Sequence, residues 1–236
     1  MGKNHIKLII FDWDDVFTLG SSSAYYACYH EAMVTVGVEL AKEEEVKRIK
    51  SNWGKPHTDE LAVLLKERPE LVDTAVEAYE RSIFTETFSK HLSFVPRGKQ
   101  FLEALRPRFK LALATGMNPR LLKENMMPKF DIRINLFDQI VTLHDLTDPR
   151  RGKPFPDMIY KILKTTGVGL ESTIMVGDAK ADVGMAQAAG VIPVVVLTGH
   201  LTKKEAINLG VKYILNKVTE LEDVLDSIQG DLGKNK

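Results

Sequence analysis

The sequence has few of the features that mark disulfide-bonded, membrane-spanning or nucleic-acid-binding proteins. Cys28 is the only cysteine, so no disulfide can form within the chain, and this favours a reducing compartment. The N-terminal apolar run, Leu8 to Phe11, is too short for a signal peptide core or a membrane span. There are 32 basic and 32 acidic residues, so the formal net charge is zero and gives no broad attraction to polyanions. We therefore expect a cytoplasmic protein that binds neither nucleic acid nor membrane.

The composition is that of an ordinary soluble globular protein. Hydrophobic residues make up 44% of the chain and charged residues 27%. A length of 236 residues suits one large domain, or a core that carries a smaller insert. The composition leaves the oligomeric state open.

Short apolar runs predict a parallel sheet. Each is almost continuously apolar, which is typical of strands buried on both faces: Ile6–Phe11, Leu111–Thr115, Gln139–Leu143, Thr173–Gly177 and Pro193–Leu197. Helical patterns alternate with the later runs, at Gly98–Phe109, Pro119–Met126, Pro156–Thr166 and Ala181–Ala189. This alternation predicts an α/β fold with a doubly wound parallel sheet, whose ligand site lies at the carboxyl ends of the strands.

Residues 21–92 interrupt the alternation because they contain only helical patterns. The expected helices are Ala24–Val36, Lys42–Ile49, Thr58–Glu67 and Leu71–Phe88. We therefore predict a helical cap domain at 21–92, inserted into a core formed by 1–20 and 93–228. The polar segment Gly20–Ser23 is expected to be a flexible boundary of the insert, and 229–236 a frayed tail.

The first predicted strand ends in two carboxylates. Asp12 and Asp14 are two residues apart, so on an extended segment they face the same side. Two adjacent carboxylates repel each other unless a cation or proton intervenes, and Mg²⁺ suits oxygen ligands. The alternative is an Asp-rich turn whose side chains cap backbone N–H groups.

Two further segments offer groups that could bind an anion. Thr115 and Gly116 end the second run, where a hydroxyl and close backbone donors could approach a phosphate, although a plain strand-to-helix turn has the same residues. Lys153 lies in a loop stiffened by Pro154 and Pro156. It could equally be a surface lysine ahead of a helix.

A fourth strand end carries acids again. Asp178 follows the run Thr173–Gly177, and Asp182 comes four residues later at a helix start, where an acid also favours the helix dipole. Together the four segments supply acids, a hydroxyl donor and a cation. Phosphoryl transfer requires groups of these kinds, as a nucleophile, as ligands of a metal and as fixed positive charge around the phosphate oxygens.

The order of these motifs resembles the haloacid dehalogenase-like hydrolase superfamily over nearly the whole chain. Phe11-Asp12-Trp13-Asp14 resembles its first motif, Thr115 its second and Lys153 its third. Gly177-Asp178-Ala179-Lys180-Ala181-Asp182 resembles the fourth. A helical insert between the first two motifs is similar to the C1-cap branch, which contains phosphoglycolate phosphatases and β-phosphoglucomutases.

The resemblance implies a Mg²⁺-dependent phosphatase acting on a small phosphorylated metabolite. Asp12 would be the nucleophile that forms an aspartyl phosphate, and Asp14 the general acid and base. Thr115, Gly116 and Lys153 would bind the phosphate. The resemblance further implies that Mg²⁺ is bound by Asp12, by Asp14 through its backbone carbonyl, by Asp178, and by Asp182 directly or through water.

Some residues depart from the family pattern. Asp15 stands where glycine is usual, Val16 where threonine is usual, and Leu19 where a further Asp often occurs. Asp15 and Leu19 lie in the segment that leads into the insert. These differences make the resemblance a weaker guide to the substrate than to the chemistry.

Other activities on the same fold remain as alternatives. A β-phosphoglucomutase-like sugar-phosphate mutase would need a cap that excludes water and holds a sugar ring. Trp53, Lys55 and His57 could line such a substrate site, or could form an ordinary loop. A phosphonoacetaldehyde hydrolase places a small residue where Asp14 stands. A non-catalytic scaffold would be expected to lack one or more of four residues, and this chain has all of them: Asp12, Asp14, Lys153 and Asp178.

Overall fold

The chain forms two compact units in a computed structural model that describes residues 5–52 and 55–232. The core unit comprises Met1–Leu19 and Phe94–Lys236, and the helical unit comprises Gly20–Ser93. The chain leaves the core unit through β2 (Thr18–Leu19) and returns through β3 (Ser93–Phe94), and these two segments pair as a two-stranded sheet. Each unit is described by itself below.

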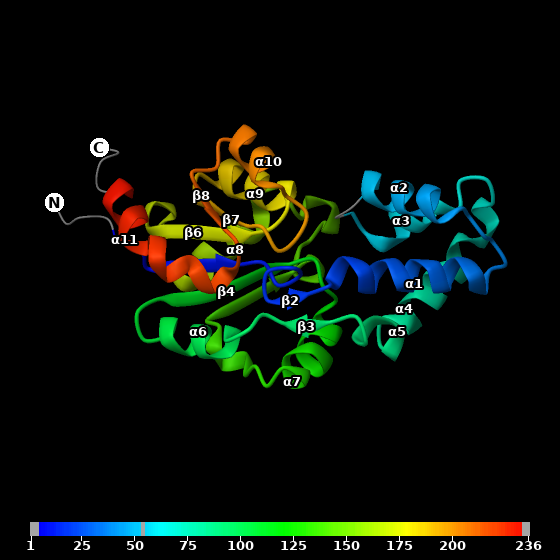
Figure 1. Cartoon of the computed structure of the whole chain (residues 1–236), viewed down its shortest axis with the longest axis horizontal. Coiled ribbons are helices and arrows are strands. Elements are labelled where there is room, and N and C mark those ends of the chain that lie inside the picture. The colour runs from blue at the N-terminus through cyan, green and yellow to red at the C-terminus, as the bar shows by residue number, and fades with distance from the viewer. Residues whose placement is uncertain (1–4, 53–54, 233–236) are drawn as a thin grey trace. The chain divides into compact units, whose positions relative to one another are not determined.

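A six-stranded sheet with the order β5-β4-β1-β6-β7-β8 forms the centre of the core unit, and every strand pair in it is parallel (Figure 1). The strands are β1 (Leu8–Phe11), β4 (Lys110–Thr115), β5 (Gln139–Thr142), β6 (Thr173–Gly177), β7 (Ile192–Val196) and β8 (Tyr213–Leu215). The prediction of a doubly wound parallel α/β sheet is confirmed. The sheet reverses its direction of winding at β1, which lies between β4 and β6.

Both faces of the sheet are buried, as the continuous apolar runs predicted. Leu8 and Ile10 of β1 pack with α8 (Asp157–Thr166) and α9 (Lys180–Ala189) in one hydrophobic cluster. Phe11 points to the opposite face and meets Phe101 of α6 (Gly98–Leu105) with ring centroids 6.3 Å apart. Successive side chains of a strand alternate between the faces, so the two layers of helices are held by alternate residues of β1.

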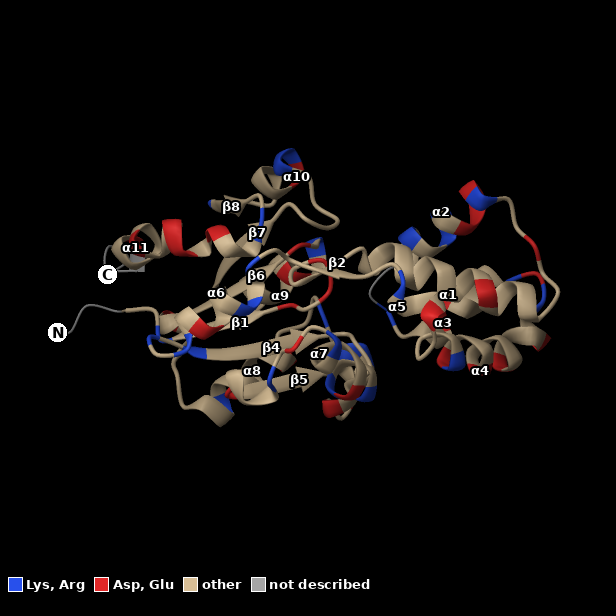
Figure 2. Cartoon of the chain, turned by 60° about the horizontal axis from the view of Figure 1, so that its bottom comes forward, with Lys and Arg blue, Asp and Glu red and all other residues tan. Residues whose placement is uncertain are grey.

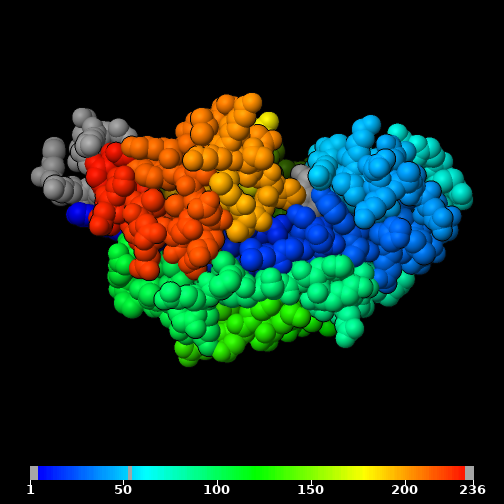
Figure 3. Space-filling view, in the orientation of Figure 1, coloured from blue at the N-terminus to red at the C-terminus, as the bar shows by residue number. Residues whose placement is uncertain are grey.

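The C-terminal part of the core unit completes the sheet. Strand β8 and the helices α10 (Lys203–Asn208) and α11 (Leu221–Leu232) were not among the predicted elements. The orange-red C-terminal segment lies beside the green segment that follows residue 94 (Figure 3), and Arg108 Nη1 pairs with Glu222 Oε1 at 3.0 Å. Residues 229–232 belong to α11, so the prediction of a frayed tail is wrong for them, and 233–236 lie outside the described residues.

The helical unit contains no strand in its described part before Ser93. Its elements are α1 (Ser21–Thr35), α2 (Lys42–Asn52), α3 (His57–Leu64), the short 3₁₀ turn η1 (Pro69–Leu71), α4 (Val72–Ser82) and α5 (Glu86–Ser89). Ser21–Ser23 form the first turn of α1, so a flexible boundary at these serines was a wrong prediction. The expected long helix Leu71–Phe88 is divided, because Thr85 accepts a hydrogen bond from Thr87 N and starts α5.

Charged residues of both signs are distributed along each unit in the view of Figure 2. Within the described ranges, every helix is too short or too polar to span a bilayer.

Candidate active site

Asp12 lies at the point where the sheet reverses its winding. Its backbone N–H donates to Val176 O of β6 at 2.9 Å, directly after the paired residues Phe11 and Val176. On the other side, Phe11 pairs with Leu113 of β4, so Thr115 ends β4 close to the same level. The parallel register therefore brings the carboxyl ends of three strands together at Asp12.

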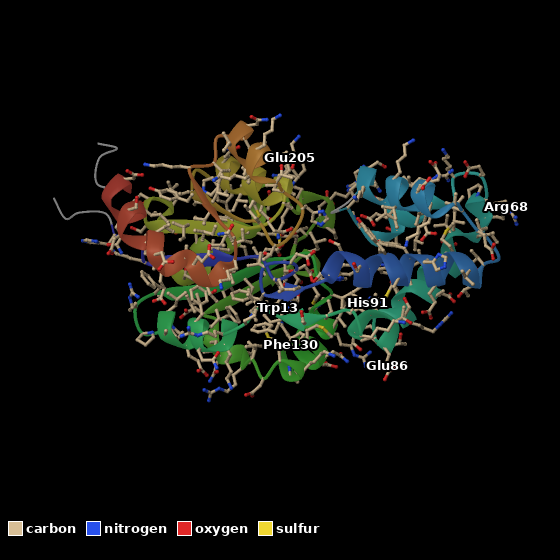
Figure 4. The ribbon with its side chains drawn as sticks, viewed as in Figure 1. Trp13, Arg68, Glu86, His91, Phe130 and Glu205 are labelled. Atoms are coloured by element: carbon tan, nitrogen blue, oxygen red, sulfur yellow. The ribbon has the colours of Figure 1, made fainter. Side chains whose placement is uncertain are left out.

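An aromatic cluster supports the segment that carries Asp12. Trp13 is fully buried and packs against Phe17 and Phe94, each with ring centroids 5.9 Å away. Phe94 in turn stacks on Phe130 at 5.1 Å (Figure 4 labels Trp13 and Phe130). Burial of a large indole fixes the backbone on both sides of it, so Trp13 helps to hold Asp12 in place.

Lys153 joins two carboxylates. Its Nζ lies 2.7 Å from Asp12 Oδ1 and 2.7 Å from Asp182 Oδ1, and its side chain is only 12% exposed. The third motif is therefore not a solvated surface lysine. Burial alone would lower the pKa of Lys153, but the charges of Asp12 and Asp182 outweigh it and raise that pKa above its ordinary value, so the ammonium stays charged.

The loop that carries Lys153 is held at both ends. Arg151 donates through Nε and Nη2 to the two carboxylate oxygens of Asp157, at 2.6 and 2.8 Å. A Cβ on Gly152 would lie 2.1 Å from Leu143 Cδ2, and one on Gly184 of α9 would lie 2.8 Å from Pro154 Cβ. The loop is thus packed tightly on each side of Lys153.

Asp178 and Asp182 are both buried beside β6. Asp182 Oδ2 accepts from the backbone N–H of Ala179 at 3.0 Å and of Asp178 at 3.3 Å, so it caps the start of α9 as well as pairing with Lys153. Gly177 makes this approach possible, because a Cβ there would lie 2.3 Å from Asp182 Cγ. Asp182, which was predicted to favour the helix dipole, thus both caps α9 and pairs with Lys153.

Asp178 lies close to the two carboxylates that pair with Lys153. Oxygens of Asp12, Asp178 and Asp182 lie within 4.8 Å of one another, and all three residues are buried. Burial raises the pKa of Asp12 to about 6, with Lys153 opposing the shift and Asp182 adding to it. Burial, followed by the charges of Asp182 and Asp12, raises the pKa of Asp178 well above its ordinary value.

These carboxylates fit a hard divalent cation. The raised pKa values of Asp12 and Asp178 indicate that one ammonium does not offset the buried negative charge, and a divalent cation would stabilise the ionised forms. Carboxylate oxygens are the ligands that hard divalent cations prefer. These three residues provide no thiolate, so the site favours hard cations over softer metals.

The remaining predicted core residues lie at the same edge of the sheet. Thr115 is fully buried, and its Oγ1 accepts from Met117 N at 3.1 Å, while Gly116 is exposed. Asp14 is half-buried, and its Oδ1 accepts from Thr18 Oγ1 at 3.5 Å. The Asp14 carboxylate is not part of the group formed by Asp12, Asp178 and Asp182. From the sequence we expected Asp14 to bind Mg²⁺ through its backbone carbonyl, not through its side chain.

The predicted substrate residues of the insert differ in their surroundings. Trp53 lies outside the described residues, and Lys55 is exposed. His57 stacks on Tyr79 with ring centroids 5.0 Å apart and has Nε2 3.0 Å from Glu80 Oε1. His57 therefore takes part in the packing of the helical unit itself.

One segment of the site was missed by the sequence reasoning. The loop after β7 places the backbone N–H of His200 3.0 Å from Asp178 Oδ2 and the hydroxyl of Thr198 2.5 Å from Asp15 O. Asp15, Asp178 and His200 form a second group of potential ligand atoms within 4.8 Å. The signal was present, because Thr198-Gly199-His200 directly follows a predicted strand, as Thr115-Gly116 does.

Comparison with known proteins identifies a matching family and a similar phosphatase. A family model described as haloacid dehalogenase-like hydrolase matches residues 9–196. A protein of Thermotoga maritima named phosphorylated carbohydrates phosphatase is 26% identical over 227 residues, covering 94% of this chain and 100% of that protein.

Solved structures show the same fold. A haloacid dehalogenase-like family hydrolase from Streptococcus pneumoniae has a TM-score of 0.75 at 22% identity, covering 92% of this chain and 97% of that one. A Thermotoga maritima protein assigned as a β-phosphoglucomutase has a TM-score of 0.70 at 23% identity, covering 94% and 99%.

Proposed function

The chain belongs to the haloacid dehalogenase-like hydrolase family, and on that premise we propose that it is a Mg²⁺-dependent phosphatase that acts through an aspartyl phosphate. The observation that carries the proposal is the placement of Asp12 at the end of β1, with Lys153 Nζ 2.7 Å from its Oδ1. A carboxylate held beside a buried ammonium can meet a phosphate whose charge that ammonium offsets. The match of residues 9–196 to the family model confirms the family resemblance inferred from the motifs.

We propose a small phosphorylated carbohydrate as the substrate class. The support is the likeness over 94% of the chain to a relative that is named for phosphorylated carbohydrates. The substrate-selecting part is proposed to be the helical unit, whose sequence is inserted between the segments of the core unit that carry Asp12 and Thr115.

In the proposed reaction an oxygen of Asp12 attacks phosphorus, and the bond from phosphorus to the ester oxygen breaks. Asp14 donates a proton to the departing oxygen. Asp14 then takes a proton from a water that attacks the aspartyl phosphate, which releases inorganic phosphate and restores the Asp12 carboxylate. Lys153 and Thr115 hold the phosphate oxygens, and the backbone at Gly116 leaves room for them.

The carboxylates of Asp12, Asp178 and Asp182, with the backbone carbonyl of Asp14, are the groups proposed to hold Mg²⁺. When bound, Mg²⁺ would offset the charge of the phosphate and of the surrounding carboxylates. Lys153 contributes a second, permanent positive charge from the protein.

A screen of the purified protein against phosphorylated metabolites, with and without Mg²⁺, tests this function. We expect release of inorganic phosphate from one or more sugar phosphates, loss of release in EDTA, and recovery with Mg²⁺ but only weak recovery with Ca²⁺, whose looser coordination would misplace the carboxylate. Following each sugar phosphate by ³¹P NMR separates hydrolysis from a mutase reaction, which would give an isomer and little free phosphate. Full activity after thorough chelation would contradict the metal requirement.

A further inference from the structure

The loop Leu197–Leu201 holds Asp178 at two places. Its first residue is fixed to the sheet, since Leu197 N donates to Leu215 O at 2.8 Å. At its other end, Leu201 N donates to the backbone carbonyl of Asp178 at 2.9 Å. Between these anchors, His200 N donates to Asp178 Oδ2 at 3.0 Å. The main chain and the carboxylate of Asp178 are thus both bonded to the same loop.

Gly199 allows the loop to lie this close. A Cβ on Gly199 would be 1.8 Å from Asp178 Oδ2 and 2.5 Å from its Cγ, far inside van der Waals contact. The backbone of Gly199 is not in the left-handed region that the structure records for Gly20, Gly190 and other glycines. Space beside the carboxylate, and not backbone conformation, is therefore what an alanine at this position would lack.

The loop also fixes the turn that follows Asp14. Thr198 Oγ1 donates to Asp15 O at 2.5 Å, and Asp15 N donates to Thr18 O at 2.7 Å. Asp15 has a φ of 52°, in the left-handed region that non-glycine residues adopt less readily than glycine, so hydrogen bonds to its backbone help to hold it there. The Thr198 hydroxyl is one of the groups that hold it.

We infer that Leu197–Leu201 is a positioning loop that fixes the Asp178 carboxylate in its Mg²⁺-binding orientation, and that this depends on Gly199. The inference rests on the proposed function, since it concerns the same cation. Asp178 lies near two other carboxylates that repel it, and the backbone N–H of His200 is a donor that needs no side chain. Groups that orient a ligand in this way contribute strongly to metal affinity.

Titration of the folded, metal-free protein with Mg²⁺ alone, by calorimetry, tests the inference without reference to turnover. Gly199→Ala should weaken Mg²⁺ binding by roughly tenfold to a hundredfold. The matched control is Gly230→Ala in α11, where an added Cβ meets nothing within 4 Å, and its Mg²⁺ affinity should equal that of the wild type. Circular dichroism verifies that each variant is folded.

Two further variants keep the test decisive. Thr198→Val removes one hydroxyl with little change of shape and should weaken Mg²⁺ binding by roughly threefold, so it carries the test if Gly199→Ala does not fold. His200→Ala keeps the backbone N–H and should bind Mg²⁺ as the wild type does. The inference is overturned if folded Gly199→Ala binds Mg²⁺ like the wild type, or if His200→Ala loses as much affinity, which would make the imidazole a ligand.

These outcomes are separate from failure of the proposed function. A wild-type protein that binds Mg²⁺ but hydrolyses no phosphate ester would contradict the phosphatase proposal and leave the binding test of the loop intact. An active phosphatase whose Gly199→Ala variant keeps full Mg²⁺ affinity would contradict the positioning role alone.

Discussion

At the scale of single residues, burial changes what ordinary side chains can do. Asp12 and Asp178 have raised pKa values because they are removed from water, and Lys153 keeps its charge because Asp12 and Asp182 surround it. The reactivity of the site therefore depends on the mutual placement of these groups more than on the identity of any one of them.

Asp12→Asn should remove the proposed nucleophile while preserving the fold, because the amide has nearly the shape of the carboxylate. We expect kcat for the best substrate to fall by about three orders of magnitude or more. Asp226→Asn on the exposed side of α11 is the matched control and should keep wild-type activity. An Asp12→Asn enzyme that kept about a tenth of the wild-type kcat would show that another group attacks phosphorus.

Cys28 should be unreactive in the folded protein. It is fully buried in α1, and burial raises the pKa of its thiol to about 11, so almost no thiolate is present near neutral pH. A disulfide reagent at pH 8 should label the single cysteine only after unfolding in denaturant. Labelling of the native protein at the rate of a free thiol would contradict this placement.

The same shift predicts a pH effect on stability. The unfolded thiol loses its proton near pH ~8.5, whereas the folded one keeps it to about pH 11, so the unfolded state binds fewer protons between these values. The contribution of Cys28 to stability is therefore fully present below the lower value and is lost as pH rises. The free energy of unfolding, measured with urea, should fall more between pH 8 and pH 11 for the wild type than for Cys28→Ala.

At the scale of elements, glycines set how closely the loops approach the helices. Gly184 lets α9 pack against Pro154, and Gly152 lets the same loop pass Leu143. Since the position of Lys153 follows from the position of this loop, Gly184 affects the placement of the Lys153 charge through its contact with Pro154.

Gly184→Ala should displace the Lys153 loop, because its Cβ would lie 2.8 Å from Pro154 Cβ. We expect the affinity for inorganic phosphate to fall several-fold, and the free energy of unfolding to drop by about 1–3 kcal/mol, as for other overpacked sites. Phosphate titration and urea unfolding measure the two effects, and Gly230→Ala serves as control. Unchanged phosphate affinity in a destabilised variant would mean that the loop adapts without moving Lys153.

At the scale of the whole molecule, the two units divide the sequence between chemistry and the proposed selection of substrate. The predicted site residues of the core, from Asp12 to Asp182, all belong to the core unit, and Lys55 and His57 belong to the helical unit. Changes in the helical unit are therefore expected to alter which ester is hydrolysed more than how phosphorus is attacked.

Lys55→Ala should change the preference among natural substrates more than the hydrolysis of a small aryl phosphate, because Lys55 is an exposed cation of the helical unit. His57→Ala should lower the melting temperature as well, since it removes the contacts with Tyr79 and Glu80. Comparing kcat/KM for several esters with thermal unfolding separates these effects. An equal slowing of every substrate by Lys55→Ala would contradict a selective role.

The sequence by itself determined the α/β class and where to search for the site. Buried parallel strands have continuous apolar runs, and their carboxyl ends share one edge, so the sequence alone groups the polar residues that follow β1, β4 and β6. The sequence did not predict β8, because three residues at the edge of a sheet give too short an apolar pattern.

Only the tertiary structure decided how the grouped residues meet. The order of strands put β1 between β4 and β6, and the packing of loops placed Lys153 between Asp12 and Asp182 and the loop Leu197–Leu201 against Asp178. These contacts join residues far apart in the chain, and their burial sets the pKa of Asp12. Local sequence patterns do not give the distances between these side chains, because those distances arise only when the separate elements pack together.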